Sequence, residues 1–131
     1  MREILFRGKR LDNGEWVYGY YVHIGPVSCQ RAYIIPEYAS SLYVNEVDPS
    51  TVGQYTGLKD KNGKRIFEGD IAKVLQGKDK DIAYVGFENG AFMLYPKTGN
   101  IYERTLWEYW YNDWDVEVIG NITDNQELLE K

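Results

Sequence analysis

The sequence holds very few of the side chains on which metal centres and nucleophilic enzymes depend. It contains one cysteine, Cys29, and one histidine, His23. A structural zinc site uses about four such ligands, and a serine or cysteine nucleophile needs a base, for which His23 is the only histidine. A single cysteine forms no internal disulfide, which fits a reducing compartment. We therefore expect no catalytic residue, no metal and no cofactor, and a protein that is not an enzyme.

Long apolar segments and an excess of positive charge are also missing. No apolar run approaches the ~20 residues that span a bilayer, and residues 1–7 lack the apolar core of a signal peptide. The 20 acidic residues outnumber 15 basic ones, so the formal net charge is -5. This charge disfavours general binding to nucleic acid or anionic membranes. We expect a cytoplasmic protein with no membrane partner, and nucleic acid is disfavoured as a partner.

Aromatic residues and Asn-Gly dipeptides are abundant instead. Aromatic residues make up 15% of the chain and include 12 tyrosines, a composition that favours strands. Asn-Gly occurs at residues 13–14, 62–63 and 89–90, and this dipeptide accepts the positive φ angles of type I′ hairpin turns. Apolar arms flank residues 89–90, which makes that hairpin the clearest. A second hairpin is predicted near residues 62–63.

Short strands between tight turns predict a mainly β fold. Further strands are expected at residues 33–35, 71–75 and 115–119, and the last alternates strictly between apolar and acidic side chains. Such a series is typical of a small barrel or roll of short antiparallel strands. The length fits one domain. If the chain has a seam, we expect it near residues 46–51.

Helical signals are sparse and predict one or two short helices. Residues 104–112 have the spacing of about two turns, and residues 124–129 predict a final turn capped by Asp124. Asp48 before Pro49 resembles an N-cap followed by proline at the first helical position.

Two ligand-binding motifs fail on their spacing. Residues 57–64 have five residues between Gly57 and the Gly-Lys pair, and Arg65 follows, whereas a phosphate-binding loop needs four and then Ser or Thr. The same stretch lacks the glycine and glutamate positions of a calcium loop. A charged hairpin turn explains it better. Paired carboxylates at Glu68 and Asp70, and along residues 113–117, leave a metal-dependent enzyme open as a minor alternative.

Charge and aromatic area are both unevenly distributed. Residues 57–65 hold four basic side chains against one acid, and residues 103–131 hold eight acids against two bases. These regions are either separate solvated faces or surfaces that attract each other between subunits. Five aromatic residues lie within residues 107–114. One core face does not cover so many rings in a short segment, so some are expected to form an interaction surface.

The order of the motifs resembles that of the YopX family of phage and prophage proteins. The resemblance begins at residues 2–8, continues through residues 13–19, is strongest over residues 52–71 and closes at residues 116–122. The strongest part holds Gly-Leu-Lys-Asp-Lys-Asn-Gly-Lys followed by Ile-Phe-Glu-Gly-Asp-Ile. Thr123 stands where the family has a larger side chain. Gln126 stands where proline is usual, at the start of the last helical turn.

The resemblance implies a fold and a setting, but it carries no catalytic residue across. It implies a small SH3-like β-barrel or roll, a phage or prophage origin and a location in the host cytoplasm. Within one YopX-like domain, residues 1–131, we expect an N-terminal lobe at about 1–50. The barrel-forming part is expected at about 51–123, and a short C-terminal tail at 124–131.

Two functional hypotheses follow. The leading one is a phage accessory protein of unknown biochemical role that acts through protein–protein contacts, with a host or phage protein or a second copy of itself as partner. Its candidate surface comprises Trp107, Trp110, Tyr111 and Trp114. The alternative is a nucleic-acid-binding β-barrel that uses a basic hairpin formed by Lys59, Lys61, Lys64 and Arg65.

Overall fold

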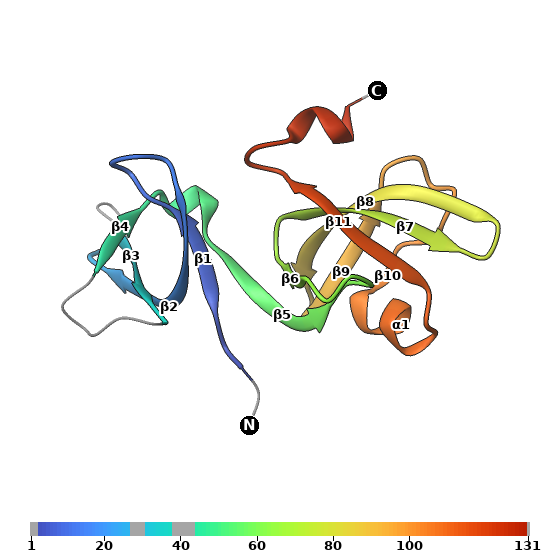
Figure 1. Cartoon of the computed structure of the whole chain (residues 1–131), viewed down its shortest axis with the longest axis horizontal. Coiled ribbons are helices and arrows are strands. Elements are labelled where there is room, and N and C mark those ends of the chain that lie inside the picture. The colour runs from blue at the N-terminus through green and yellow to red at the C-terminus, as the bar shows by residue number, and fades with distance from the viewer. Residues whose placement is uncertain (1–2, 27–30, 38–43, 131) are drawn as a thin grey trace. The chain divides into compact units, whose positions relative to one another are not determined.

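The computed structural model describes residues 3–26, 31–37 and 44–130, so Cys29 lies outside the described residues. The chain divides into two compact units, Met1–Tyr55 and Thr56–Lys131, which we call the N-terminal and C-terminal units (Figure 1). The boundary between the units lies a few residues C-terminal to the expected seam at residues 46–51. Strand β5 (Gly53–Lys59) begins in the first unit and continues into the second.

The N-terminal unit is a curled antiparallel sheet. Its strands are β1 (Phe6–Lys9), β2 (Trp16–Ile24), β3 (Arg31–Pro36) and β4 (Asn45–Val47), and the start of β5 pairs with β1. The order is β4-β3-β2-β1-β5, and β6 (Arg65–Phe67), which belongs to the C-terminal unit, follows β5 in the same sheet. A single bridge between Arg10 and Val47 brings β4 back to the end of β1. Ala32, Ile34 and Val47 form the buried centre.

The C-terminal unit is built on a second antiparallel sheet, ordered β10-β9-β8-β7-β11. Its elements are β6 (Arg65–Phe67), β7 (Asp70–Gln76), β8 (Asp79–Glu88), β9 (Ala91–Pro96), β10 (Arg104–Thr105), α1 (Leu106–Tyr111) and β11 (Asp115–Asn121). The core gathers one face of these strands, including Ala72, Val74, Val85 and Leu94, with Leu106 and Tyr109 from α1. The helix is therefore attached to the sheet by two of its own side chains.

The mainly β prediction is confirmed, but the small barrel or roll is confirmed only as antiparallel sheets, because no closed barrel forms in the described residues. In the described residues the strands form two open antiparallel sheets. Each sheet ends in very short strands, β4 in the first and β10 in the second. A strand of two or three residues offers too few backbone groups for a full closing ladder.

The hairpin predictions hold, but the turn types differ. Asn89 and Gly90 both have positive φ, 53° and 84°, as a type I′ turn requires. At residues 62–63 only Gly63 does, with φ 82°. There the backbone N–H of Gly63 donates to the carbonyl of Asp60, and the N–H of Asp60 donates to the carbonyl of Lys64. This is a three-residue loop that ends in a left-handed glycine.

Short helices occur near the predicted places. Asp48 caps the 3₁₀ helix η2 (Pro49–Thr51) by accepting from the N–H of Ser50. The final turn, η3 (Gln126–Leu129), follows Asn125 without a side-chain cap, so the prediction that Asp124 caps it is wrong. Lys97 Nζ donates instead to carbonyl oxygens of Leu128 and Glu130. None of the helices in the described residues has the length and apolarity needed to cross a membrane.

Candidate functional site

The signature turn, which we define as residues 57–70, is held together by one buried carboxylate. Asp60 is 8% exposed. Its Oδ1 accepts from the backbone N–H groups of Asn62 and Lys64, each at 2.9 Å. Its Oδ2 accepts from the N–H of Val118 on β11, also at 2.9 Å. The hydrogen bond from Val118 thus attaches the turn to β11, which is distant from it in the sequence.

A second contact completes this attachment. The N–H of Lys61 donates to the carbonyl of Val116 at 3.0 Å. Together with the Asp60–Val118 bond, it occupies backbone groups of β11, the edge strand of its sheet. Covering an edge in this way prevents further strands from pairing there. The signature turn therefore covers the β11 edge of the sheet in the C-terminal unit.

The end of the signature turn is also structural. Gly69 has φ 92°, a conformation that favours glycine. Its N–H donates to the carbonyl of Val85 and its carbonyl accepts from the N–H of Ile122, each at 2.8 Å. Asp70 is 1% exposed, and its Oδ2 accepts from the N–H of Phe67 at 2.7 Å. Glycine and carboxylate both serve the turn between β6 and β7.

The basic side chains of this region do not share one role. Lys61 Nζ lies 3.7 Å from Glu117 Oε1, so part of the expected attraction between basic and acidic regions occurs within one chain. Lys59 and Lys64 are exposed, whereas Arg65 at the start of β6 is half-buried. The four residues therefore differ in their exposure to a phosphate backbone, and Lys61 lies beside an acid.

A capping box starts helix α1. The hydroxyl of Thr105 accepts from the N–H of Glu108, and the carboxylate of Glu108 accepts from the N–H of Thr105. The backbone hydrogen bond from Thr105 lowers the pKa of Glu108, and the Thr105 hydroxyl and the Arg104 guanidinium add to this effect against partial burial. The ionised carboxylate thus fixes the first turn.

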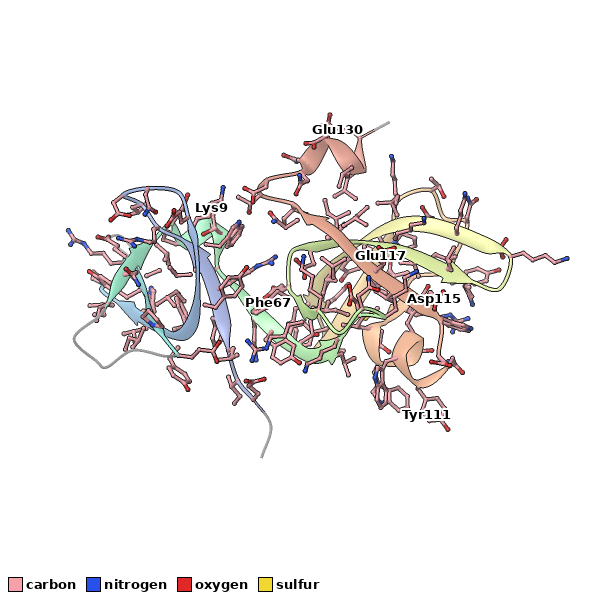
Figure 2. All side chains as sticks on the ribbon, viewed as in Figure 1. Lys9, Phe67, Tyr111, Asp115, Glu117 and Glu130 are labelled. Atoms are coloured by element: carbon pink, nitrogen blue, oxygen red, sulfur yellow. The ribbon has the colours of Figure 1, made fainter. Side chains whose placement is uncertain are left out.

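The helix turns its largest side chains outward. Leu106 and Tyr109 are buried in the core. Trp107, Trp110 and Tyr111, at i, i+3 and i+4, share the opposite side and are 54%, 56% and 68% exposed. Trp107 and Tyr111 stack with ring centroids 4.9 Å apart. Figure 2 shows Tyr111 projecting from α1 away from the strands. We call these three residues the aromatic face.

Trp114 differs from the other three candidate surface residues. It is half-buried and packs edge-to-face on Tyr109, with centroids 5.0 Å apart and an interplanar angle of 68°. Its ring lies against the hydrophobic core of the C-terminal unit. Trp114 therefore anchors the segment that carries the aromatic face, and its substitution would disturb the core.

A groove of about 340 Å³ lies between the signature turn and the segment after α1. Its lining includes Lys59, Asp60 and Lys61 from the signature turn and Asp113 and Asp115 from the segment after α1. Trp110 also lines the groove. Figure 2 shows Asp115 beside Glu117 on β11. We call this the charged groove. Side chains of both charge signs and an aromatic ring therefore line the same groove.

A second groove, of about 440 Å³, lies on the Trp107 side of the helix. Its lining is mainly apolar and includes Leu58, Phe92, Leu106 and Trp107. Phe92 packs edge-to-face on Phe87, which is 53% exposed. The aromatic face is thus flanked by a charged groove and an apolar one.

A family model described as YopX protein matches residues 5–130. The chain belongs to the YopX family. The signature turn of this YopX protein lies within the matched residues, and its carboxylates Asp60 and Asp70 accept backbone hydrogen bonds. No curated protein matches the chain.

The fold has a counterpart among solved structures. The crystal structure of protein EF1440 from Enterococcus faecalis is similar, with a TM-score of 0.56 and 24% sequence identity. The match covers 99% of this chain and 100% of that one. At this identity the likeness concerns the fold of the YopX chain alone.

Sequence reasoning missed three features, two of which have readable signals. Thr-Leu-Trp-Glu at residues 105–108 is a capping-box pattern. Asp-Lys-Asn-Gly at residues 60–63 is typical of an aspartate that bonds the backbone of its own turn. Asp81 accepts from the N–H groups of Ile82, Thr98 and Asn100. Burial opposes ionisation of Asp81, but these bonds and the Thr98 hydroxyl outweigh it and lower its pKa.

Proposed function

We propose that this protein is a non-enzymatic accessory protein of phage or prophage origin that binds another protein in the host cytoplasm. The aromatic face of α1 is its contact surface. The observation that carries the proposal is the orientation of α1, which exposes more than half of Trp107, Trp110 and Tyr111. The phage setting rests on membership of the YopX family.

The aromatic face has the composition of a binding surface. Tryptophan and tyrosine are enriched at protein interfaces and at the residues that contribute most to affinity. Each ring buries ~150–250 Å² when it is covered, so contact with a partner removes much apolar area from water. The three side chains also sit on a capped helix whose other side is fixed in the core. Their positions are therefore largely set before binding.

A catalytic role has less support. In the described part of the chain, no group of three or more His, Cys, Asp and Glu side chains is placed to hold a metal ion. The carboxylates of Asp60 and Asp70 accept backbone hydrogen bonds. Nucleic-acid binding by residues 59–65 also has less support, because Lys61 is paired with Glu117 and acids line the same groove.

A photocrosslinking amino acid placed at position 110 tests the proposal in a bacterial host that expresses the full chain. We expect one discrete adduct from position 110, and its loss when Trp107 and Tyr111 are both changed to serine. Position 78 is the control, because Lys78 is exposed in the turn between β7 and β8. Equal labelling from positions 110 and 78, or no adduct from position 110, would overturn the proposal.

A further inference from the structure

We infer that the charged groove and the aromatic face form a two-fold symmetric contact with a second copy of this chain. The inference rests on the proposed function and names the partner. The lining of the groove includes Lys59 and Lys61 from the signature turn, which we call its basic wall, and Asp113 and Asp115 from the segment after α1, which we call its acidic wall. Among the described residues, Lys59, Asp113 and Asp115 form no ion pair. Three of these four charges are therefore without an ion-pair partner among the described residues, and Lys61 alone of the four is paired, with Glu117.

The arrangement of these charges selects the kind of partner. A partner of one charge sign would be repelled by one wall. An apolar partner would bury charged side chains without ion pairs, which is strongly unfavourable. The groove thus needs a partner with both signs in matching places. A second copy supplies them, because a two-fold axis along the groove sets the basic wall of each copy against the acidic wall of the other.

The aromatic face supplies apolar area to the same contact. Trp110 belongs both to the face and to the lining of the groove. Its position beside the axis brings the two Trp110 rings together, with Trp107 and Tyr111 at the margin. The exposed parts of three such rings amount to roughly 250–450 Å² per copy. A stable interface buries about 800 Å² per partner, so this area gives a modest affinity that the charged walls orient.

Symmetry makes the contact testable by charge reversal. In a dimer of the Lys59→Glu variant, the new acid lies opposite Asp113 and Asp115 of the other copy. In a dimer of the Asp115→Lys variant, the new base lies opposite Lys59 and Lys61. Each variant alone should therefore weaken self-association at least about tenfold. In an equimolar mixture, Glu at position 59 of one chain meets Lys at position 115 of the other, and the original Lys59 meets the original Asp115. The mixture should therefore form a mixed dimer with affinity restored to within about threefold of the unaltered protein.

Sedimentation velocity over a concentration series measures these affinities, and circular dichroism verifies the fold of each variant. Lys78→Glu, which makes the same change on an exposed turn, should leave association unchanged. Trp110→Ser should abolish it. A monomer at all concentrations up to several hundred micromolar, or a dimer insensitive to both reversals, would overturn the inference. If position 110 nevertheless crosslinks to a different protein in cells, the proposed function stands with another partner. If it crosslinks to nothing, both fail.

Discussion

Asp60 and Trp110 both line the charged groove, but they relate to the rest of the chain in opposite ways. Asp60 is 8% exposed and accepts three backbone hydrogen bonds, one of them from a distant strand. Trp110 is 56% exposed, on a helix whose neighbours Leu106 and Tyr109 enter the core. Two residues of the same groove thus serve the fold and the surface, respectively.

This difference separates what is recognisable in the sequence from what is available for binding. The signature turn has a recognisable sequence pattern, yet its Asp60 and Asp70 bond to the backbone and its glycines adopt the positive φ angles of turns. The aromatic face has no comparable motif, yet it exposes the side chains that a partner could cover. Four variants, ordered by their expected effect on stability, test whether this division is correct.

The largest effect is expected for Asp60→Ala. The change removes the acceptor of three N–H groups, and the bond from the N–H of Val118 is partly buried. Charge-assisted bonds of this kind contribute about 1.5–3 kcal/mol each, and two of the three donors can bond to water instead. We expect the free energy of unfolding to fall by about 2–4 kcal/mol in a urea titration. Asp79→Ala, an exposed control, should change it by less than about 0.5 kcal/mol. Equal losses would contradict the role of Asp60.

A smaller loss is expected for Gly63→Ala. Gly63 has φ 82° and no atom within 4 Å of the position that a Cβ would take, so strain of the backbone is the only cost. Such strain amounts to roughly 1–2 kcal/mol. Gly63→Asn is the matched control, because asparagine tolerates this conformation better. Thermal unfolding should rank glycine above asparagine and asparagine above alanine. A different order would show that the turn is set by something other than φ.

The capping box should make a contribution that depends on pH. Thr105→Ala should cost about 1 kcal/mol. Because the pKa of Glu108 is lowered in the folded chain, its stabilisation is complete above the unfolded value and is lost as pH falls through the folded value. Tryptophan fluorescence between pH 6 and pH 3 should therefore report loosening of α1 at the acid end. Thr105→Ala should reduce the amplitude of this change. An unchanged amplitude would show that the capping box does not cause the pH-dependent loosening of α1.

The smallest effect on stability is expected for Trp110→Ser. The side chain is more than half exposed, so its loss should change the free energy of unfolding by less than about 0.5 kcal/mol. Trp114→Ser is the contrast, because that ring packs on Tyr109 in the core. Its loss should cost several times more in the same denaturant titration. Equal costs would mean that Trp110 is also part of the core.

Local patterns in the sequence predicted much of the fold. The alternation of Val116 with acidic neighbours placed β11, and Asn89-Gly90 placed the hairpin between β8 and β9. Both signals depend on residues that are adjacent in the chain. The openness of the sheets was not predictable in this way, because it depends on how long β4 and β10 become once their neighbours are in place.

The candidate site was predictable only in part. The aromatic content of residues 107–114 indicated a surface, and the structure places three of those rings outward while Trp114 packs inward. Which rings point outward depends on where α1 begins, and the cap at Thr105 decides that. The charged groove joins residues 59–61 to residues 113–115 through the bond from Val118 to Asp60. No local pattern reports a contact between such distant segments.

The division between fold and surface is tested most directly by measuring Asp60→Asn and Trp110→Ser side by side, each for unfolding free energy and for self-association. If this division is correct, the two variants lose different properties. Asp60→Asn should lose at least about 1.5 kcal/mol of stability, because it loses the charge and one acceptor oxygen, and Trp110→Ser should retain full stability but lose association in sedimentation velocity. A Trp110→Ser protein that unfolds as easily as Asp60→Asn, or that associates as the unaltered chain does, would contradict it.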